Sequence, residues 1–228
     1  MATTETLKLE FQLLSPATFG RGDGLPGVVD AEVEHDQHGF PFLRGRSLRG
    51  LLAEEMRGLL YVLDLENNPR WGLACDRLLG TDGAMLHRSG IMRISDGTLP
   101  KAVRQLIADA TDERKGDVTR SMVLESLTAI RRQTAMNPFG APESTSLRAI
   151  RVILRGTIFE STFAFDQALQ PLEKALLAAS VMAWRRAGTA RNRGRGRLRA
   201  WIKSDEVPGP DAWMVEQFRI FEKEIGQR

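Results

Sequence analysis

The chain has 228 residues, of which 42% are hydrophobic and 27% charged, and its formal net charge is +3. These proportions are typical of a folded globular chain of one domain and exclude a largely disordered chain. No apolar run reaches the roughly 18 residues of a membrane span, and the first residues do not resemble a secretory signal. The single cysteine, Cys75, excludes an internal disulfide and a cysteine-based zinc site, so we expect a cytoplasmic protein with no membrane partner.

The hydrophobic pattern predicts the elements in chain order. Apolar and polar residues alternate over residues 7–13, which indicates a half-buried strand. A long polar, glycine-rich loop follows, from residue 15 to about residue 41, and Ser47 is then expected to cap an amphipathic helix. The later elements are a strand at 91–95, a helix at 100–110, strands at 147–155 and 158–165 with a turn at Gly156, a helix at 169–186, a strand at 198–203 and a short helix from 211, which packs Trp213 and Phe218 against the body.

This order of elements predicts the fold class. Strand, helix, strands, helix and strand in succession favour an antiparallel α+β sandwich of the ferredoxin-like type. The sequence has no internal repeat and no clear linker, so we expect residues 1–228 to form a single domain.

Two short motifs are weak in their context. Residues 22–27 match a dinucleotide-binding fingerprint by letter, but Pro26 lies within the turn and no helical stripe follows it. His35 and His38 could chelate a metal together with Asp36, but three side chains in an irregular loop make a weak site. The sequence HDQHG is instead typical of a hairpin turn, which gives Asp36 a structural role.

The most basic segment is TARNRGRGRLRAW, residues 189–201. Over residues 185–203 there are eight basic residues and no acidic one, and such a local block governs phosphate binding more than the net charge does. The alternative is a solvated, disordered segment, but periodic apolar residues flank it on both sides. We expect arginines to face phosphates and glycines to allow close approach of the backbone. The candidate residues are Arg191, Arg193, Gly194, Arg195, Gly196 and Arg197.

A second basic segment is GFPFLRGRSLRGLL, residues 39–52, which places a glycine-bearing turn just before a helix. Free backbone N–H groups at a helix start, together with nearby arginines, form a cradle for phosphate. A plain helix start with solubilising arginines explains the motif equally well. The candidate residues are Arg44, Gly45, Arg46, Ser47 and Arg49.

The third segment, residues 129–156, has two basic, partly apolar arms on either side of a Pro-Phe-Gly turn, which predicts a protruding β-hairpin. The chain has few aromatic residues to stack on bases, and Tyr61 is its single tyrosine. The three basic, glycine-marked segments therefore favour binding to a nucleic-acid backbone independently of base sequence.

Four motifs in this order, FLRGRSLRGLL, RLLG, the hairpin arms and RNRGRGRLR, together resemble the RAMP superfamily of CRISPR-associated proteins. The similarity is to backbone-type and Csx-type subunits of type III effector complexes. The resemblance implies a modified ferredoxin-like (RRM-like) palm with an inserted thumb hairpin at about residues 126–156, and glycine-rich loops that hold the guide. The implied partners are guide (CRISPR) RNA, target RNA and other RAMP subunits. The thumb would cross the guide–target duplex, with Met136 wedged against a base. The thumb residues that would contact the duplex are Arg131, Arg132, Gln133, Thr134 and Met136.

The resemblance also implies a catalytic residue. In cleaving members, an aspartate between the first strand and the first helix cuts target RNA, and Asp30 lies at the matching position. Cleavage by the RNA's own 2′-hydroxyl, assisted by Mg²⁺ or another divalent ion near Asp30, would leave cyclic phosphate and 5′-hydroxyl ends. Two alternatives remain: a non-catalytic subunit that caps or spaces the complex, and a guide-processing ribonuclease in which His35 or His38 is the base.

Overall fold

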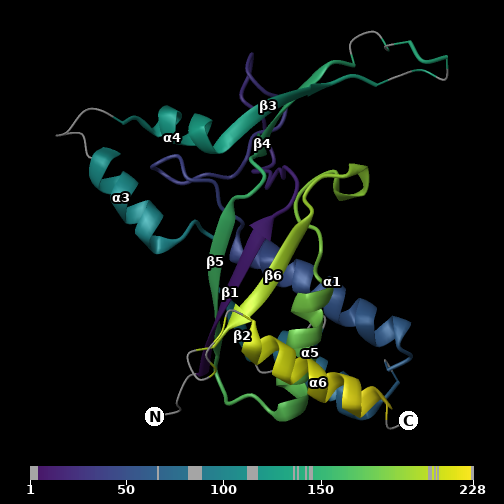
Figure 1. The fold of residues 1–228 in the computed structure, drawn as a ribbon. Coiled ribbons are helices and arrows are strands. Elements are labelled where there is room, and N and C mark those ends of the chain that lie inside the picture. Colours follow the sequence, from purple (N-terminus) through teal and green to yellow (C-terminus); the bar gives the residue numbers. More distant parts are fainter. Residues whose placement is uncertain are drawn as a thin grey trace.

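The computed structural model describes residues 5–65, 67–81, 89–111, 118–135, 137, 139–141, 143, 146–204, 207, 209 and 211–226. Two antiparallel sheets organise the fold (Figure 1). The main sheet has the order β2-β5-β1-β6, and a smaller sheet pairs β3 with β4. The strands are β1 (Glu5–Leu13), β2 (Met92–Ile94), β3 (Thr128–Gln133), β4 (Arg148–Ile153), β5 (Ile158–Phe165) and β6 (Leu198–Lys203). The helices are α1 (Gly45–Val62), α2 (Pro69–Leu79), α3 (Lys101–Thr111), α4 (Arg120–Leu127), α5 (Pro171–Ala183) and α6 (Ala212–Gly226), with a short 3-10 helix at Arg191–Arg193.

The topology of the main sheet confirms the predicted fold class. Strand β1 pairs antiparallel with both β5 and β6, and β2 pairs antiparallel with β5. Because α1 connects β1 towards β2 and α5 connects β5 to β6, the sheet consists of two split β-α-β units. The chain therefore has the α+β, ferredoxin-like arrangement that the order of elements predicts.

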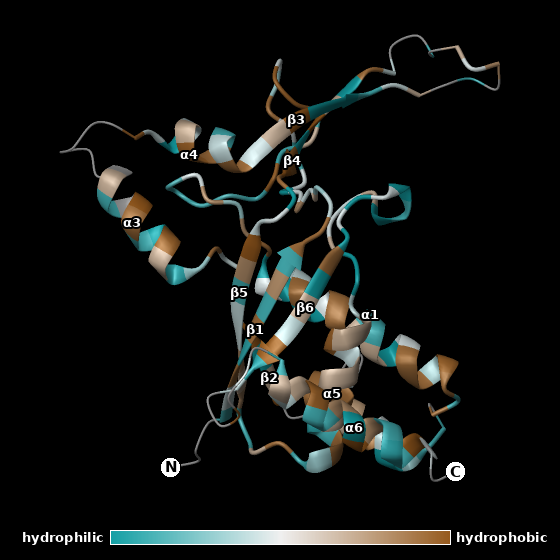
Figure 2. Cartoon of the chain, viewed as in Figure 1, coloured by the Kyte–Doolittle hydropathy of each residue, from teal (hydrophilic) through white to brown (hydrophobic). Residues whose placement is uncertain are grey.

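The core lies between the main sheet and the helices beside it. Alternate residues of β1 are buried, and α5 is buried along most of its length, so it forms the centre of the helical layer. Figure 2 shows the hydrophobic residues concentrated in this sheet and these helices. Just after α5, Trp184 is fully buried and packs edge-on against Phe11 with ring centroids 5.1 Å apart. The basic segment 185–197 therefore begins directly after a residue that is anchored in the core. Among the described residues, no helix is long and apolar enough to cross a membrane.

The predicted hairpin is present and projects from the body of the molecule (Figure 1). Its arms β3 and β4 pair from Thr128↔Ile153 to Gln133↔Arg148. Strands β4 and β5 follow each other in the sequence but lie in different sheets, and the turn at Gly156 carries the chain from one sheet to the other. Alternating hydrophobicity predicts a strand but not its partner, so the sequence left this pairing open.

The predicted N-cap at Ser47 is wrong. Helix α1 begins at Gly45, its N-cap position is Arg44 without a side-chain cap, and Ser47 lies in the first turn. The Gly45 N–H instead donates to Asp96 Oδ1 at 2.7 Å, so a carboxylate from a distant loop caps the helix.

Helices α2 and α4 were not predicted, although both carry ordinary start signals. The Asn68 side chain accepts the Arg70 N–H ahead of α2, which has proline at its first position, and the Thr119 hydroxyl accepts the Met122 N–H ahead of α4. Helix α6 has 15 residues and is longer than the short helix expected.

Candidate nucleic-acid interface

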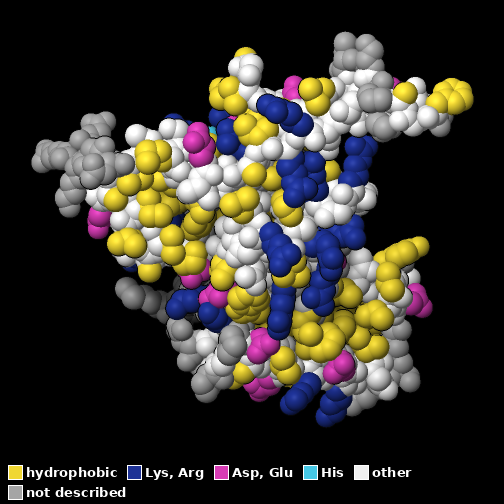
Figure 3. Space-filling model, turned by 45° about the horizontal axis from the view of Figure 1, so that its top comes forward, with side chains coloured by type: hydrophobic (Ala, Val, Ile, Leu, Met, Phe, Trp, Pro, Cys, Tyr) yellow, Lys and Arg dark blue, Asp and Glu magenta, His cyan; other side chains and the backbone are white. Residues whose placement is uncertain are grey.

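The structure brings the three basic segments together. The Arg191 guanidinium forms an ion pair with Glu54 at 3.1 Å, which joins the glycine-rich loop (residues 185–197) to α1, the helix that begins in the second segment. Arg195 Nη2 donates to Gln133 Oε1 at 2.9 Å, which joins the same loop to the hairpin. Figure 3 shows Lys and Arg side chains gathered in a band over this face of the molecule. The glycine-rich loop is therefore the link between the hairpin and the palm.

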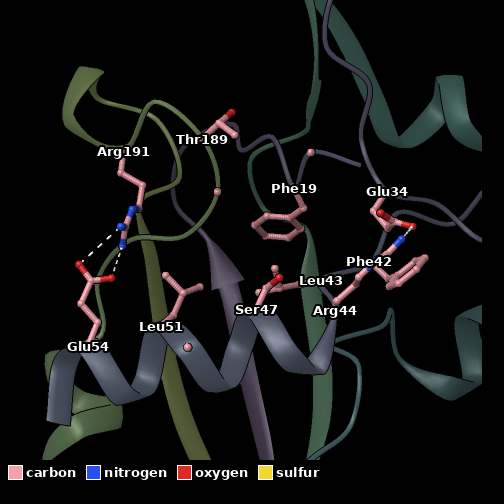
Figure 4. Close-up of a pocket in the computed structure, with 13 residues that line it drawn as sticks. Phe19, Glu34, Phe42, Leu43, Arg44, Ser47, Leu51, Glu54, Thr189 and Arg191 are labelled. Carbon is pink, nitrogen blue, oxygen red and sulfur yellow. Dashed lines mark hydrogen bonds and ion pairs between the residues drawn. The ribbon is translucent and has the colours of Figure 1, made fainter. Parts of the chain in front are cut away.

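A groove lies between α1, the loop around Phe19 and the glycine-rich loop (Figure 4). Its cavity volume is about 360 Å³. The Arg191–Glu54 pair lies at one end, the Arg44–Glu34 pair lies at the other, and Ser47 lies between them. Next to this Arg191–Glu54 pair on α1, the pKa of Glu55 is raised by burial and by the charge of Glu54, and the charge of Arg191 partly offsets the rise. The groove thus has charged groups of both signs at its ends and apolar side chains such as Phe19 and Leu51 in its wall.

The groove continues around the first turn of α1. A second hollow of about 650 Å³ shares Arg44 and Ser47 with the first and is also lined by Arg21 and Arg46. A third hollow of about 430 Å³ shares Arg46 with the second and extends past Arg49. The three hollows thus follow one another around the first turn of α1 and share lining residues.

Some groups of the expected phosphate cradle already have hydrogen-bond partners within the protein. Glu34 accepts a hydrogen bond from Arg44 at 2.7 Å and thereby raises the pKa of Arg44, and Arg49 donates to the Leu79 carbonyl. The Gly45 N–H is taken by Asp96, and a side chain at Gly45 would meet the carbonyl of Ile94, so this glycine allows close packing of α1.

Two residues of the cradle are left for a ligand. Arg46 and Ser47 have exposed side chains, and within the described residues neither their side chains nor their backbone N–H groups bond to the protein. Orphan N–H groups in a first helical turn, beside a guanidinium and a hydroxyl, form a site suited to a phosphate.

The glycine-rich loop contains one open glycine and one buried glycine. Gly194 has φ +80°, and a side chain there would meet no atom within 4 Å, so a ligand could approach its backbone. Gly196 has φ +67° and is buried, and its Cβ would lie 1.8 Å from the Ala187 carbonyl. We predicted that Gly196 lets RNA approach, but the structure assigns it a packing role inside the loop. Arg193 and Arg197 are exposed on either side of the two glycines.

The hairpin presents its basic residues on both faces. Arg131 and Arg132 are exposed, and because neighbouring strand residues point to opposite faces, Arg131 shares the face of Gln133 that meets the glycine-rich loop. Thr134 is exposed just beyond β3. The predicted wedge, Met136, lies outside the described residues.

Asp30 lies beside the hairpin, at the outer end of strand β4. Its backbone N–H donates to the Ala149 carbonyl at 2.7 Å, and its carboxylate Oδ2 accepts the Ala149 N–H at 2.6 Å. The side chain is exposed. The long loop thus carries its candidate catalytic carboxylate to the second arm of the hairpin, 119 positions further along the chain.

The other polar residues of this loop have structural contacts. Asp36 Oδ1 accepts the N–H groups of His38 and Phe40, as the predicted turn requires. His35 Nδ1 lies 3.0 Å from Arg120 Nη2, and neither histidine lines the three hollows. In the described part of the chain, no group of three or more His, Cys, Asp or Glu side chains could hold a metal ion.

Comparison with known proteins identifies the family. The sequence matches the RAMP superfamily over residues 10–199. The chain belongs to the RAMP superfamily. A chain of the Type III-B Cmr-beta complex in its apo state, solved by cryo-EM, has a TM-score of 0.60 at 12% identity, with 89% of this chain and 98% of that chain covered. A chain of Cmr-beta bound to cognate target RNA gives 0.58 at 12% identity, with coverage of 86% and 97%. No curated protein matches the sequence.

Sequence reasoning missed two parts of this RAMP site. They are Asp96, which caps α1, and the buried ion pair of Glu32 with Arg151, which lies beside Asp30. Neither belongs to a recognisable motif, because each contact joins loops that are far apart in the sequence.

Proposed function

We propose that this RAMP protein is a guide-RNA-binding subunit of a type III CRISPR effector complex and that it cleaves complementary target RNA through Asp30. The observation that carries the proposal is the place of Asp30: its exposed carboxylate is bonded to the outer end of β4, in a hairpin that is itself bonded to the basic loop. The structural likeness to a chain of Cmr-beta bound to cognate target RNA supports it.

The guide RNA would follow the groove around α1. The N–H groups of Arg46 and Ser47 and the exposed guanidinium groups of Arg46, Arg193 and Arg197 recognise phosphate oxygens rather than base edges. Binding is then independent of base sequence, and specificity for the target comes from pairing with the guide. The hairpin extends from this groove across the paired strands.

Cleavage would use the RNA's own hydroxyl. The 2′-oxygen attacks the adjacent phosphorus, the P–O5′ bond breaks, and the leaving 5′-oxygen takes a proton from water. The products carry a 2′,3′-cyclic phosphate and a 5′-hydroxyl. Asp30 would orient the 2′-hydroxyl or accept its proton. Mg²⁺ commonly takes one or two protein carboxylates and completes its shell with water and substrate phosphates, so a lone Asp30 fits as a ligand, and the ion would supply charge neutralisation at the phosphate.

One observation favours the alternative of a non-catalytic capping or spacing subunit. Asp30 Oδ2 already accepts the Ala149 N–H, and this bond alone would account for an aspartate at this position. The two roles differ in one measurable property, since a structural aspartate is needed for assembly and a catalytic one for cutting.

The test is to purify the protein with the other subunits of its locus, sequence the bound RNA, and incubate the complex with end-labelled complementary RNA. We expect guide RNA to co-purify, and Asp30→Ala to retain assembly and target binding while the cuts made by this subunit disappear from a denaturing gel. A complete ladder with Asp30→Ala would assign cutting to another residue or subunit and favour the non-catalytic role.

A further inference from the structure

A buried ion pair lies beside Asp30, two residues further along the same stretch of chain. Glu32 and Arg151 are 3% and 7% exposed, and Arg151 Nε lies 2.9 Å from Glu32 Oε1 and 3.0 Å from Oε2. Each partner is held by a further contact, since Glu32 Oε1 accepts the Val33 N–H and Arg151 Nη1 donates to the Thr128 hydroxyl. Hydrogen bonds satisfy both charged groups, so the pair has a fixed geometry.

Backbone hydrogen bonds also join this loop to β4. Asp30 N–H donates to the Ala149 carbonyl at 2.7 Å, and Arg151 N–H donates to the Ala31 carbonyl at 3.0 Å, so residues 30–31 pair in parallel with the outer edge of β4. Residues two apart on a strand point to the same face. Asp30 with Ala149, and Glu32 with Arg151, are therefore equivalent pairs in one register. In the first pair Asp30 is exposed and Ala149 half-buried, whereas both members of the second pair are buried.

We propose that Glu32 and Arg151 are positioning residues that fix Asp30 to the hairpin arm β4, so that the carboxylate and the hairpin move over the RNA as one body. The proposal rests on the proposed function, in which Asp30 acts on target RNA. It has a specific consequence: the phosphate that is cut is set by where the hairpin crosses the duplex, because the ion pair holds the distance between them constant.

General stability is the competing explanation, and the two can be separated. Removing one partner of a buried ion pair leaves an uncompensated charge and destabilises a protein, whereas replacing both by apolar side chains of similar size is often neutral. The double variant Glu32→Leu/Arg151→Met therefore preserves packing while it removes the oriented contact. Glu173→Gln is a matched control for Glu32→Gln, since Glu173 is 1% exposed and pairs with Arg77 at 2.7 Å away from the hairpin.

The experiment introduces Glu32→Gln, the double variant and Glu173→Gln separately into the assembled complex. For the first two we expect target binding to persist and the single-turnover cleavage rate at saturating target to fall roughly 10- to 100-fold, since misplacing a reacting group by about 1 Å can cost that much. The cuts should also spread over neighbouring phosphates. Glu173→Gln should leave the cut position unchanged.

Several results would overturn the proposal. It fails if Glu32→Gln and the double variant cut at the wild-type rate and phosphate, and it fails equally if neither assembles on guide RNA, since the pair then serves folding alone. If Asp30→Ala still cuts, the proposed function fails. Amide hydrogen exchange on the isolated protein then tests separately whether the Glu32–Arg151 pair holds Asp30 against β4. Faster exchange at Asp30 and Ala149 in Glu32→Gln supports this attachment, and unchanged protection overturns it.

Discussion

Arg195 donates a hydrogen bond from Nη2 to Gln133 Oε1 at 2.9 Å, and this contact joins the glycine-rich loop to the first arm of the hairpin. Arg195 is half-buried, and its Nη1 is a buried atom that has no protein partner among the described residues. The guanidinium is thus oriented by one bond and held close to the hairpin. A phosphate contact through Arg195 would couple guide binding to the position of the thumb.

The first prediction concerns this contact. Gln133→Ala should lower the free energy of unfolding by about 1 kcal/mol, the usual net contribution of one hydrogen bond, because Arg195 loses its acceptor. Urea unfolding of Gln133→Ala, Arg195→Met and the double variant forms a cycle that isolates the pairwise term. Strictly additive effects would show that the two side chains are neighbours without an energetic link.

The second prediction distinguishes the arginines of the loop. Arg193 and Arg197 are exposed, whereas Arg191 and Arg195 already contact Glu54 and Gln133. Arg193→Gln/Arg197→Gln should weaken binding about equally for unrelated single-stranded RNAs and reduce the salt slope by about 1.4, since each lost phosphate contact removes roughly 0.7.

The control for this pair removes two charges elsewhere. Arg70 and Arg219 lie on α2 and α6, and neither lines the three hollows around α1. Arg70→Gln/Arg219→Gln should leave the salt slope close to the wild-type value. An equal drop in both double variants would mean that net charge, rather than the glycine-rich loop, determines RNA binding.

The third prediction compares two glycines with similar backbone angles. Gly196→Ala should lower the free energy of unfolding by roughly 2–4 kcal/mol, because a left-handed conformation costs about 1–3 kcal/mol for other residues and the new Cβ would also meet the Ala187 carbonyl. Gly194→Ala should cost about 1 kcal/mol, since its Cβ would point into open space. Both values follow from urea unfolding, and equal costs would contradict the packing role of Gly196.

The sequence predicts the local elements of this fold better than their partners. The alternation of β1 and the bounds of β6 are evident because each strand has one buried face. The bond from Gly45 to Asp96 joins residues 51 positions apart, and that from Arg151 to Glu32 joins residues 119 apart. Such contacts depend on how loops fold over one another, and no local pattern encodes them.

The sequence likewise predicts the local features of the candidate site but not its long-range contacts. The sequence identifies the basic segments by composition, and the family resemblance identifies Asp30. Which arginines are already paired within the protein depends on the positions of acidic residues such as Glu34 and Glu54 in the folded chain. Sequence alone therefore treats Arg44 and Arg46 alike, although the structure leaves Arg46 exposed without a protein partner within the described residues.

The last prediction separates the two roles of Asp30. Asp30→Asn retains a side-chain oxygen that can accept the Ala149 N–H, so the loop should remain attached to β4 and the complex should assemble and bind target as the wild type does. It removes the negative charge that orients a 2′-hydroxyl or binds a divalent ion, so cleavage by this subunit should be abolished. In the wild type, chelation by EDTA should stop cutting without releasing the target, and cutting should return on addition of Mg²⁺, because a single carboxylate fits Mg²⁺ only in company with substrate phosphate. Gel analysis of end-labelled target measures cutting, and filter binding measures retention. Undiminished cutting by Asp30→Asn would show that the carboxylate acts through its bond to Ala149 and not through its charge.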